Sequence, residues 1–263
     1  AKKIQEKLKE VIKKNNLNLV LNIYQIGNNS SSNIYIKKKQ EFGQYIGIQV
    51  NHIKLEENDI AQTKLIELLK TDQSDGLIIQ LPLASKYDQE LICSYIPFDK
   101  DVDGLNEKSN FYPVTALATL FLLKAYKINL KNKKIAVVGQ SKIVGKPLSY
   151  LLEKESKNNV DKYDLNNKPP QQFNQDLIAI AIDKPNHFKN YNFKKESIIV
   201  DIGFHKINNK TYGNVDRNDL DVKAITPIIG GIGPLTVSFL FINLLKTKNI
   251  NLDLEKIIDS CSS

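Results

Sequence analysis

The chain has no methionine and no tryptophan, one arginine (Arg217), and Cys93 and Cys261 as its cysteines. Two cysteines so far apart do not form a disulfide framework, and the lack of CxxC or Cys/His clusters argues against zinc. We expect both to be buried or surface thiols in a reducing compartment, with no metal bound. The lack of methionine indicates that residue 1 is not the translation start.

Acidic residues are outnumbered, with 37 Lys+Arg against 29 Asp+Glu and a net charge of +8. Nucleic-acid-binding faces usually cluster arginine among aromatic side chains, whereas these lysines are spread along every element. The composition predicts no nucleic-acid partner, although the charge can attract an anionic small substrate. A chain of 263 residues, 41% hydrophobic and 25% charged, is typical of one large globular domain or two modest ones.

Long apolar runs that would indicate a membrane segment are also scarce. The N-terminus is charged, without the apolar core of a signal peptide. Residues 224–245 carry no charge, but two prolines and three glycines in the first half leave about ten residues for regular helix. We therefore predict a loop followed by a buried helix there, no membrane partner, and a cytoplasmic location.

Apolar spacing and capping residues predict the elements along the chain. Helices are expected over 4–12, 33–42, 58–69, 88–96 with Asp88 as cap, 115–127 with Thr115 as cap, 144–154 and 254–261. Strands are expected over 17–26, 45–50, 76–80, 135–138, 177–182 and 198–202, with a loop at 27–30. The polar segment 157–175 is weakly patterned, which predicts a variable or mobile loop.

The alternation of strands and helices predicts the α/β class. We expect two α/β domains joined by long helices, with a cleft between them. The first should span 1–114, with a C-terminal helix in 241–263 packing back on it, and the second 115–240.

A loop at 225–237 holds three glycines and two prolines and runs directly into an apolar helix. Glycine lets the backbone approach a ligand closely and proline stiffens the loop, so main chain could grip a flat ligand here. Taken alone, the same pattern also fits a tight strand-to-helix turn.

Five segments in order resemble the bifunctional methylenetetrahydrofolate dehydrogenase/methenyltetrahydrofolate cyclohydrolase family. They are Gly27-Asn28 leading to 32–39 (SNIYIKKK), 80–83 (QLPL), 100–104 (KDVDG), 138–147 (VGQSKIVGKP) and the 225–237 loop. Their order is specific and covers nearly the whole chain. The resemblance implies that the first domain binds folate and catalyses, and that the second is a Rossmann-like dinucleotide-binding domain.

Taken alone, Lys39 lies in a run of lysines that fits a solvated helix face. Tyr35 and Lys39 share one helix face, and the resemblance implies that Lys39 is the central catalytic group and that Tyr35 stacks on the folate. Proton transfer near neutral pH requires a lowered lysine pKa. Gln80, at a strand end, can hold the amine through its carbonyl oxygen, and the resemblance implies that Asp103 binds the amino-pyrimidine edge of the pterin.

Asp101 is expected to cap or orient its own loop. The resemblance implies further substrate-binding residues, namely Ser32, Gly230, Gly231, Pro234 and Thr236. It also implies a homodimer that oxidises 5,10-methylenetetrahydrofolate with a nicotinamide nucleotide and then hydrolyses the methenyl product to 10-formyltetrahydrofolate.

The turn 139–145, between an apolar strand and a helix, matches the family's dinucleotide loop. It offers main-chain N–H groups and a helix N-terminus to a pyrophosphate. The expected contacts are Gly139, Gln140, Ser141, Ile143, Val144 and Gly145, with Asp164 and Asp183 nearby.

Three departures from the family lie on the nucleotide side. Members that use NADP commonly carry arginine, which suits a 2′-phosphate, where Gln140 stands. Asp164 aligns with a serine and suits the free ribose diol of NAD. Asp183 replaces a glycine and adds bulk and negative charge. NAD and NADP thus both remain open as cofactors, with binding impaired if Asp183 obstructs it.

Ala116 and Ile229 each replace a proline near the folate. A cyclohydrolase that has lost hydride transfer is one alternative, and a folate- or protein-binding relic of the fold is another. Lys39, Gln80 and Asp103 together count against the relic.

Overall fold

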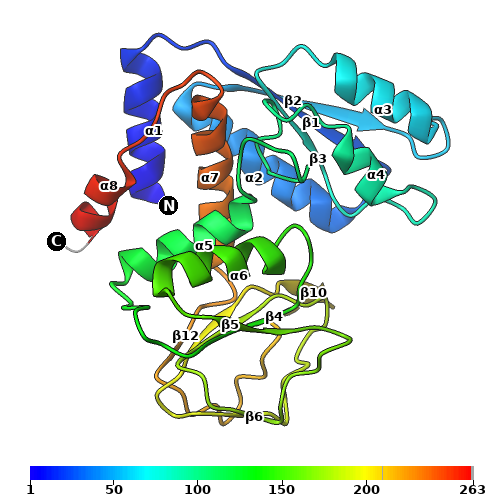
Figure 1. Cartoon of the computed structure of the whole chain (residues 1–263). Helices are drawn as coiled ribbons and strands as arrows, with labels where there is room; N and C mark the ends of the chain where they lie inside the picture. Colours follow the sequence, from blue (N-terminus) through cyan, green and yellow to red (C-terminus); the bar gives the residue numbers. More distant parts are fainter. Residues whose placement is uncertain (209, 262–263) are drawn as a thin grey trace. The chain divides into compact units, whose positions relative to one another are not determined.

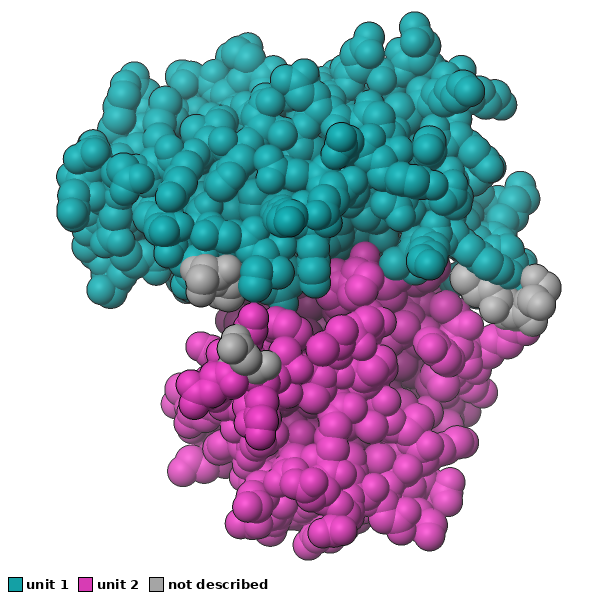
Figure 2. Space-filling model, turned by 180° about the vertical axis from the view of Figure 1, so that it is seen from behind, with its two compact units in different colours: residues 1–114, 237–263 teal, residues 115–236 magenta. Residues whose placement is uncertain are grey.

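The computed structural model describes residues 1–208 and 210–261, with two compact units that are coloured separately in Figure 2. One unit comprises Ala1–Val114 and Val237–Ser263, and the other Thr115–Thr236. Both are α/β, as the sequence predicts, and the second has a Rossmann-like parallel sheet. None of the described helices combines the length and apolar character that a membrane crossing needs.

The first unit has a parallel three-stranded sheet in the order β2-β1-β3 (Figure 1). Its strands are β1 (Val20–Ile26), β2 (Gln49–Leu55) and β3 (Gly76–Ile79). Its helices are α1 (Lys2–Lys14), α2 (Ser30–Ile46), α3 (Gln62–Thr71), α4 (Gln89–Ser94) and α8 (Leu254–Cys261), together with most of α7 (Ile232–Lys246). Strand β3 is buried along its whole length, as a short apolar run in a parallel sheet should be.

Two apolar layers enclose this sheet. Tyr24 and Leu77 on the strands pack with Leu65 and Ile92 of α3 and α4. Helix α7 supplies another layer, where Phe241 stacks on Phe42 of α2 at 5.0 Å between ring centroids. Strand β3 and helix α2 are therefore both held in place by core packing.

The second unit has a parallel sheet in the order β12-β9-β7-β4-β5, with α5 (Val114–Ala125) and α6 (Gly145–Ser156). The strands are β4 (Ile135–Val138), β5 (Val160–Tyr163), β7 (Leu177–Ile180), β9 (Ile198–Asp201) and β12 (Ala224–Ile225). Short pairs are formed by β6 (Gln172–Phe173) with β8 (Asn192–Phe193) and by β10 (His205–Ile207) with β11 (Lys210–Tyr212). An aromatic cluster around Phe173 and Phe188 packs against the sheet residues Ala136 and Ile178.

The order of the sheet creates a switch point. From β4 the chain goes first to β5 on one side and then to β7 on the other. Ligands of open parallel sheets bind outside the carboxyl ends of the strands at such a point. Here those ends lead into Gly139 and Ala181.

Several predicted boundaries are wrong. Tyr45 lies in α2, which ends only at Ile46 and is followed by Gly47, a glycine with φ +86° of the kind that terminates helices. The predicted strand at 45–50 is therefore displaced to Gln49–Leu55. The predicted loop 157–175 contains the edge strand β5, which the pattern missed because only Val160 of its residues is buried.

Two helix starts also differ from the prediction. Thr115 is not a cap, because α5 already begins at Val114. Helix α7 has 15 residues rather than about ten, since it begins at Ile232 and takes Gly233 and Pro234 into its first turn. Proline is tolerated there because its missing N–H would have had no helical partner. The Asp88 cap is confirmed, with Oδ1 accepting from the N–H of Leu91 at 2.9 Å.

Candidate active site

Lys39 is a buried lysine held by a buried strand end. It lies on α2 with 8% of its surface exposed, and its Nζ donates to Oε1 of Gln80 at 3.0 Å. Gln80 directly follows β3, and its own Nε2 donates to the carbonyl of Leu81 at 2.9 Å. This second bond orients the amide so that its oxygen faces the lysine. The predicted hydrogen bond between Gln80 and the Lys39 amine is confirmed.

Asp103 is the acidic partner of this amine. It is half-buried in the loop after Lys100, whose carbonyl accepts from the N–H of Leu77 on β3 at 2.9 Å. Burial raises the pKa of Asp103, and the charge of Lys39 opposes that rise. The loop therefore carries a carboxylate electrostatically coupled to the lysine.

The lysine shows the converse effect. Burial lowers the pKa of Lys39, and the charge of Asp103 offsets part of the decrease. The two shifts bring the pKa values of an ordinarily acidic group, Asp103, and an ordinarily basic group, Lys39, closer together. Perturbed pairs of this kind are characteristic of proton-transfer sites.

The start of α2 places the other predicted folate contacts of this unit. Oδ1 of Asn29 accepts from the N–H of Ser32 at 3.1 Å, an N-capping bond, and Ser32 is 4% exposed. Tyr35 is half-buried, and burial raises the pKa of its hydroxyl. It lies one turn before Lys39 on the same helix, as predicted.

Asp101, two residues before Asp103, is fully buried, and its Oδ2 accepts from the N–H of Asn106 at 2.8 Å. It orients its loop, as the sequence suggests. Burial is the main cause that raises its pKa to about 6. The nearby Cys93 thiol is buried as well, and burial with surrounding acidic charge raises its pKa to about 12, so it is not a reactive thiolate.

The second unit holds the remaining predicted folate residues. Gly230 has φ +82° and open space around it, whereas a Cβ on Gly231 would lie 2.3 Å from the carbonyl oxygen of Pro227. Pro234 stands in the first turn of α7, and Thr236 follows that turn, with its Oγ1 donating to the carbonyl of Gly233 at 2.7 Å. The loop therefore requires glycine at these points and presents exposed main chain at Gly230.

The turn after β4 fits a dinucleotide. Gly139 has φ +92°, and a Cβ on it would lie 2.1 Å from the carbonyl oxygen of Ala181. A Cβ on Gly145 would lie 1.6 Å from the carbonyl oxygen of Gly139. Strand, turn and helix thus approach too closely for any side chain. Ser141 is exposed, Ile143 and Val144 are half-buried, and α6 begins at Gly145 at the switch point.

Gln140 is turned inward. Its Nε2 donates to the carbonyl of Val137 at 3.0 Å and lies 3.3 Å from Oγ of Ser149, a buried residue of α6. Its side chain joins β4 to α6.

Asp164 follows β5, next to the turn, since the N–H of Gly139 donates to the carbonyl of Tyr163 at 2.8 Å. Asp164 is exposed, and hydrogen bonds from the N–H groups of Asn167 and Asn166 hold its pKa below the usual range.

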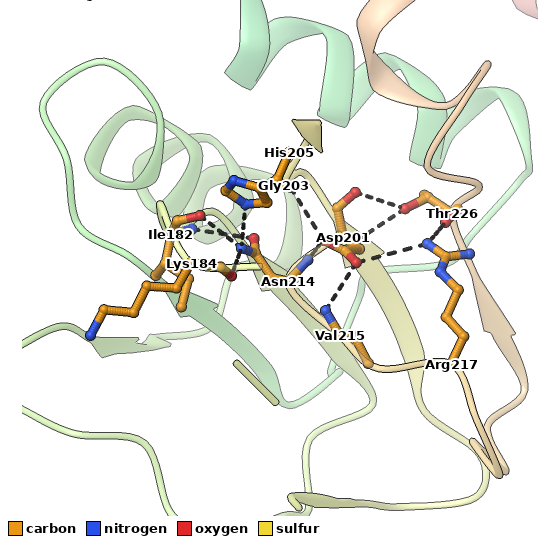
Figure 3. A network of polar contacts seen from close by, with 9 residues as sticks. All are labelled: Ile182, Lys184, Asp201, Gly203, His205, Asn214, Val215, Arg217 and Thr226. Atoms are coloured by element: carbon orange, nitrogen blue, oxygen red, sulfur yellow. Dashed lines mark hydrogen bonds and ion pairs between the residues drawn. The ribbon is translucent and has the colours of Figure 1, made fainter. Parts of the chain in front are cut away.

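Asp183 is exposed and lies 3.6 Å from Nδ1 of His205. The segment around it is fixed by Asn214, whose Nδ2 donates to the carbonyls of Ile182 at 2.7 Å and Lys184 at 2.8 Å (Figure 3). The backbone that carries Asp183 is therefore held on both sides.

The same network reaches the 225–237 loop (Figure 3). Asp201, at the end of β9, accepts from the N–H groups of Gly203, Asn214 and Val215. Arg217 lies 3.8 Å from this carboxylate and donates from Nη2 to the carbonyl of Thr226 at 2.7 Å. The chain's one arginine thus secures the start of the glycine loop. Sequence reasoning missed Asp201 and Asn214, although a carboxylate directly after a buried strand is a usable signal.

The structure brings Lys39, Gln80 and Asp103 together in the first unit, and Gly139, Gly145 and Asp164 together in the second. Gly230, Gly231, Pro234 and Thr236 belong to the second unit or its boundary with α7. Over residues 1–208 and 210–261 no cluster of three or more His, Cys, Asp or Glu side chains could hold a metal ion.

An α/β chain with a buried lysine–carboxylate site and a glycine turn at a parallel-sheet switch point belongs to the class of two-domain proteins with a Rossmann-like nucleotide-binding domain. Comparison with known families places it more closely. Residues 1–103 match the tetrahydrofolate dehydrogenase/cyclohydrolase catalytic domain, and residues 113–252 match the NAD(P)-binding domain of the same family. The chain belongs to the tetrahydrofolate dehydrogenase/cyclohydrolase family.

Individual relatives agree with this assignment. The chain is 37% identical to the bifunctional protein FolD of Mycoplasma mobile, over 94% of this chain and 95% of that protein. It is 35% identical to FolD of Rickettsia massiliae, over 91% and 89% of the two chains. The crystal structure of FolD from Campylobacter jejuni, a methylenetetrahydrofolate dehydrogenase/cyclohydrolase, superposes with a TM-score of 0.86 at 32% identity, covering 94% of this chain and 95% of that one.

Proposed function

We propose that this chain oxidises 5,10-methylenetetrahydrofolate to the methenyl form with NAD(P) and hydrolyses the methenyl form to 10-formyltetrahydrofolate. The observation that carries the proposal is the buried Lys39 amine, bonded to Gln80 at 3.0 Å and coupled to Asp103. Family membership and FolD relatives that match over most of their length support both activities.

In the hydrolysis, water adds to the methenyl carbon and loses a proton. The bond from that carbon to N5 then breaks as N5 gains a proton, while the hydroxyl group loses its remaining proton to solvent and becomes the formyl carbonyl. Lys39, with its lowered pKa, is suited to accept the first proton and return it to N5. Gln80 keeps the amine in place through Oε1, and Asp103 accepts hydrogen bonds from the amino-pyrimidine edge of the pterin.

For the oxidation, the close approach of Gly139 and Gly145 supports a main-chain cradle for the nucleotide pyrophosphate at the start of α6. NAD(P) supplies the acceptor for the hydride that leaves the methylene carbon. Lys39 and Asp103 would hold the folate during this step.

Absorbance of the methenyl chromophore tests both steps. With the protein and NAD or NADP, methylenetetrahydrofolate should generate the chromophore. With the protein and no nucleotide, methenyltetrahydrofolate should lose the chromophore faster than it does in buffer without protein. No enzyme-dependent change in either assay would overturn the proposal. Hydrolysis without oxidation would instead leave a cyclohydrolase only.

We propose that NAD serves at least as well as NADP. The inward-turned Gln140 offers no charged fork, and Asp164 places a carboxylate beside the turn that suits a ribose diol. Lys146, whose charge lowers the pKa of Asp164, is a nearby cation that could favour NADP. Calorimetric titration with both nucleotides decides between them, and tighter binding of NADP would refute the preference.

The predicted domains are proposed in the same terms: 1–114 with the C-terminal helix of 241–263 for folate binding and catalysis, and 115–240 for the nucleotide. A homodimer is proposed as well, consistent with the position of β2 at the edge of the first sheet. Analytical ultracentrifugation tests the dimer.

A cytoplasmic location, consistent with the unpaired Cys93, is tested by cell fractionation.

A further inference from the structure

Asn243 is a buried polar residue in the most apolar stretch of α7. It is 0% exposed, and its neighbours Phe241, Ile242, Leu244 and Leu245 are at most 1% exposed. Its Nδ2 donates to the carbonyl of Val102 at 2.9 Å, although the two residues are 141 positions apart. Val102 is the residue directly before Asp103.

The other carbonyls of the Asp103 loop have main-chain partners. That of Lys100 accepts from the N–H groups of Leu77 and Val102, and that of Asp101 accepts from the N–H of Gly104. The Asp103 carbonyl accepts from the N–H of Val114 at 3.3 Å. Among the described residues, the Val102 carbonyl instead accepts from a side chain that is distant in sequence, that of Asn243. Because a peptide unit is planar, holding this carbonyl also fixes the N–H of Asp103.

Packing alone does not account for an amide at position 243. The Val102 side chain is fully buried and, with Leu244, leaves room for no side chain at Gly76, where a Cβ would lie 2.7 Å from each. A leucine would suit such surroundings, whereas Oδ1 of Asn243 is buried without a hydrogen-bond partner. Leaving a buried polar atom unpaired is unfavourable, so the amide has a cost in stability as well as a benefit.

We propose that Asn243 is a positioning residue that sets the direction of the Asp103 carboxylate through the Val102–Asp103 peptide. The inference rests on the proposed role of Asp103 in binding the pterin. It makes folate recognition depend on a side chain of α7 that is remote from Asp103 in sequence.

The test replaces Asn243 by leucine, which keeps the branched shape and the number of side-chain heavy atoms and removes the donor, and by serine, in case the leucine variant does not fold. Leu245→Ala is the matched control, a fully buried change on the same helix without a bond to the loop. Both Asn243 variants should raise KM for methenyltetrahydrofolate about tenfold, with a smaller change in kcat. This is the effect expected when a misdirected Asp103 loses one hydrogen bond to the pterin. Leu245→Ala should lower Tm and leave KM unchanged.

A double-mutant cycle separates positioning from general loosening of the unit. In the Asp103→Asn background, removing Asn243 should add less than twofold to KM, because the two residues act on the same contact. Independent, multiplicative effects would overturn the proposal, as would variants of Asn243 whose KM matches that of the wild type. An inactive wild type would refute the proposed function itself, whereas an active wild type with unchanged variants would refute only the role of Asn243.

Discussion

At the scale of single residues, the site depends on the burial of a charged side chain, that of Lys39. A lysine on a helix face in a run of lysines would ordinarily be solvated, yet Lys39 is buried and bonded to Gln80. The sequence could predict this bond because the YxxxK register and a glutamine after a buried strand limit the geometry. It could not predict the burial of Asp101 or the contact of Asn243, since both depend on packing between segments far apart in sequence.

Replacing Lys39 by methionine should remove cyclohydrolase turnover while keeping most of the side-chain volume. Loss of a positioned proton-transfer group typically costs about 10²- to 10⁴-fold in rate. Lys37→Met, on an exposed face of the same helix, is the control. Stopped-flow loss of methenyl absorbance measures both variants. Equal rates for the two would show that Lys39 is not the proton-transfer group.

Asp101 should make stability depend on pH. Burial raises its pKa to about 6 in the folded protein, above the value near 4 of an unfolded chain. The folded state therefore binds the proton more tightly, and stability from this group is present below about pH 4 and lost as pH rises through about 6. A shift of this size corresponds to about 3 kcal/mol.

Asp101→Asn removes that titration and keeps an oxygen for the N–H of Asn106. Relative to the wild type, its free energy of unfolding should increase between pH 4 and 7, as measured by urea denaturation at several pH values. The exposed neighbour Asp99, changed to asparagine, is the control. A difference between Asp101→Asn and the wild type that does not vary with pH would contradict the prediction.

At the scale of elements, short apolar strands and the glycine turn were predictable because their residues allow few alternatives. Strand β3 and the Gly139–Gly145 turn lie where the pattern places them. The pattern does not predict strand β5, because β5 is an edge strand in which Val160 is the one buried residue and the other residues are polar or partly exposed. Helix α2 continued beyond its predicted end because Gly47, rather than Gly43, adopts the left-handed conformation that ends it.

The turn between β4 and α6 yields an element-scale prediction. Gly145→Ala puts a methyl group 1.6 Å from the carbonyl oxygen of Gly139, so the turn must open. NAD(P) affinity should fall at least tenfold, on the order of one or two lost main-chain hydrogen bonds. Hydrolysis of methenyltetrahydrofolate should persist, because Lys39 and Gln80 lie in the other unit.

Gly233→Ala is the matched glycine control, since a Cβ there meets nothing within 4 Å. Its Tm should match that of the wild type. Calorimetric titration of Gly145→Ala with NAD and NADP, at a temperature where it is folded, measures the effect. Wild-type affinity would mean that the turn does not form the pyrophosphate cradle.

At the scale of the whole molecule, the lysine surplus bears on how substrates arrive. The net charge is +8, and the folate carries the carboxylates of its glutamate tail. The field of a charged protein raises the encounter rate of an oppositely charged ligand, and salt screens it over about 10 Å at 0.1 M. No single lysine needs to contact the substrate for this effect.

We therefore expect kcat/KM for methenyltetrahydrofolate to fall severalfold between about 0.01 and 0.2 M potassium chloride, with kcat at saturation nearly constant. A tail of several glutamates should make the decrease steeper, because each added carboxylate increases the charge that the field acts on. Sucrose at matched osmolarity controls for effects other than screening. Equal slopes for the short and long tails would show that the net charge does not steer the folate, and would restrict the electrostatic contribution to the pair formed by the buried Lys39 and Asp103.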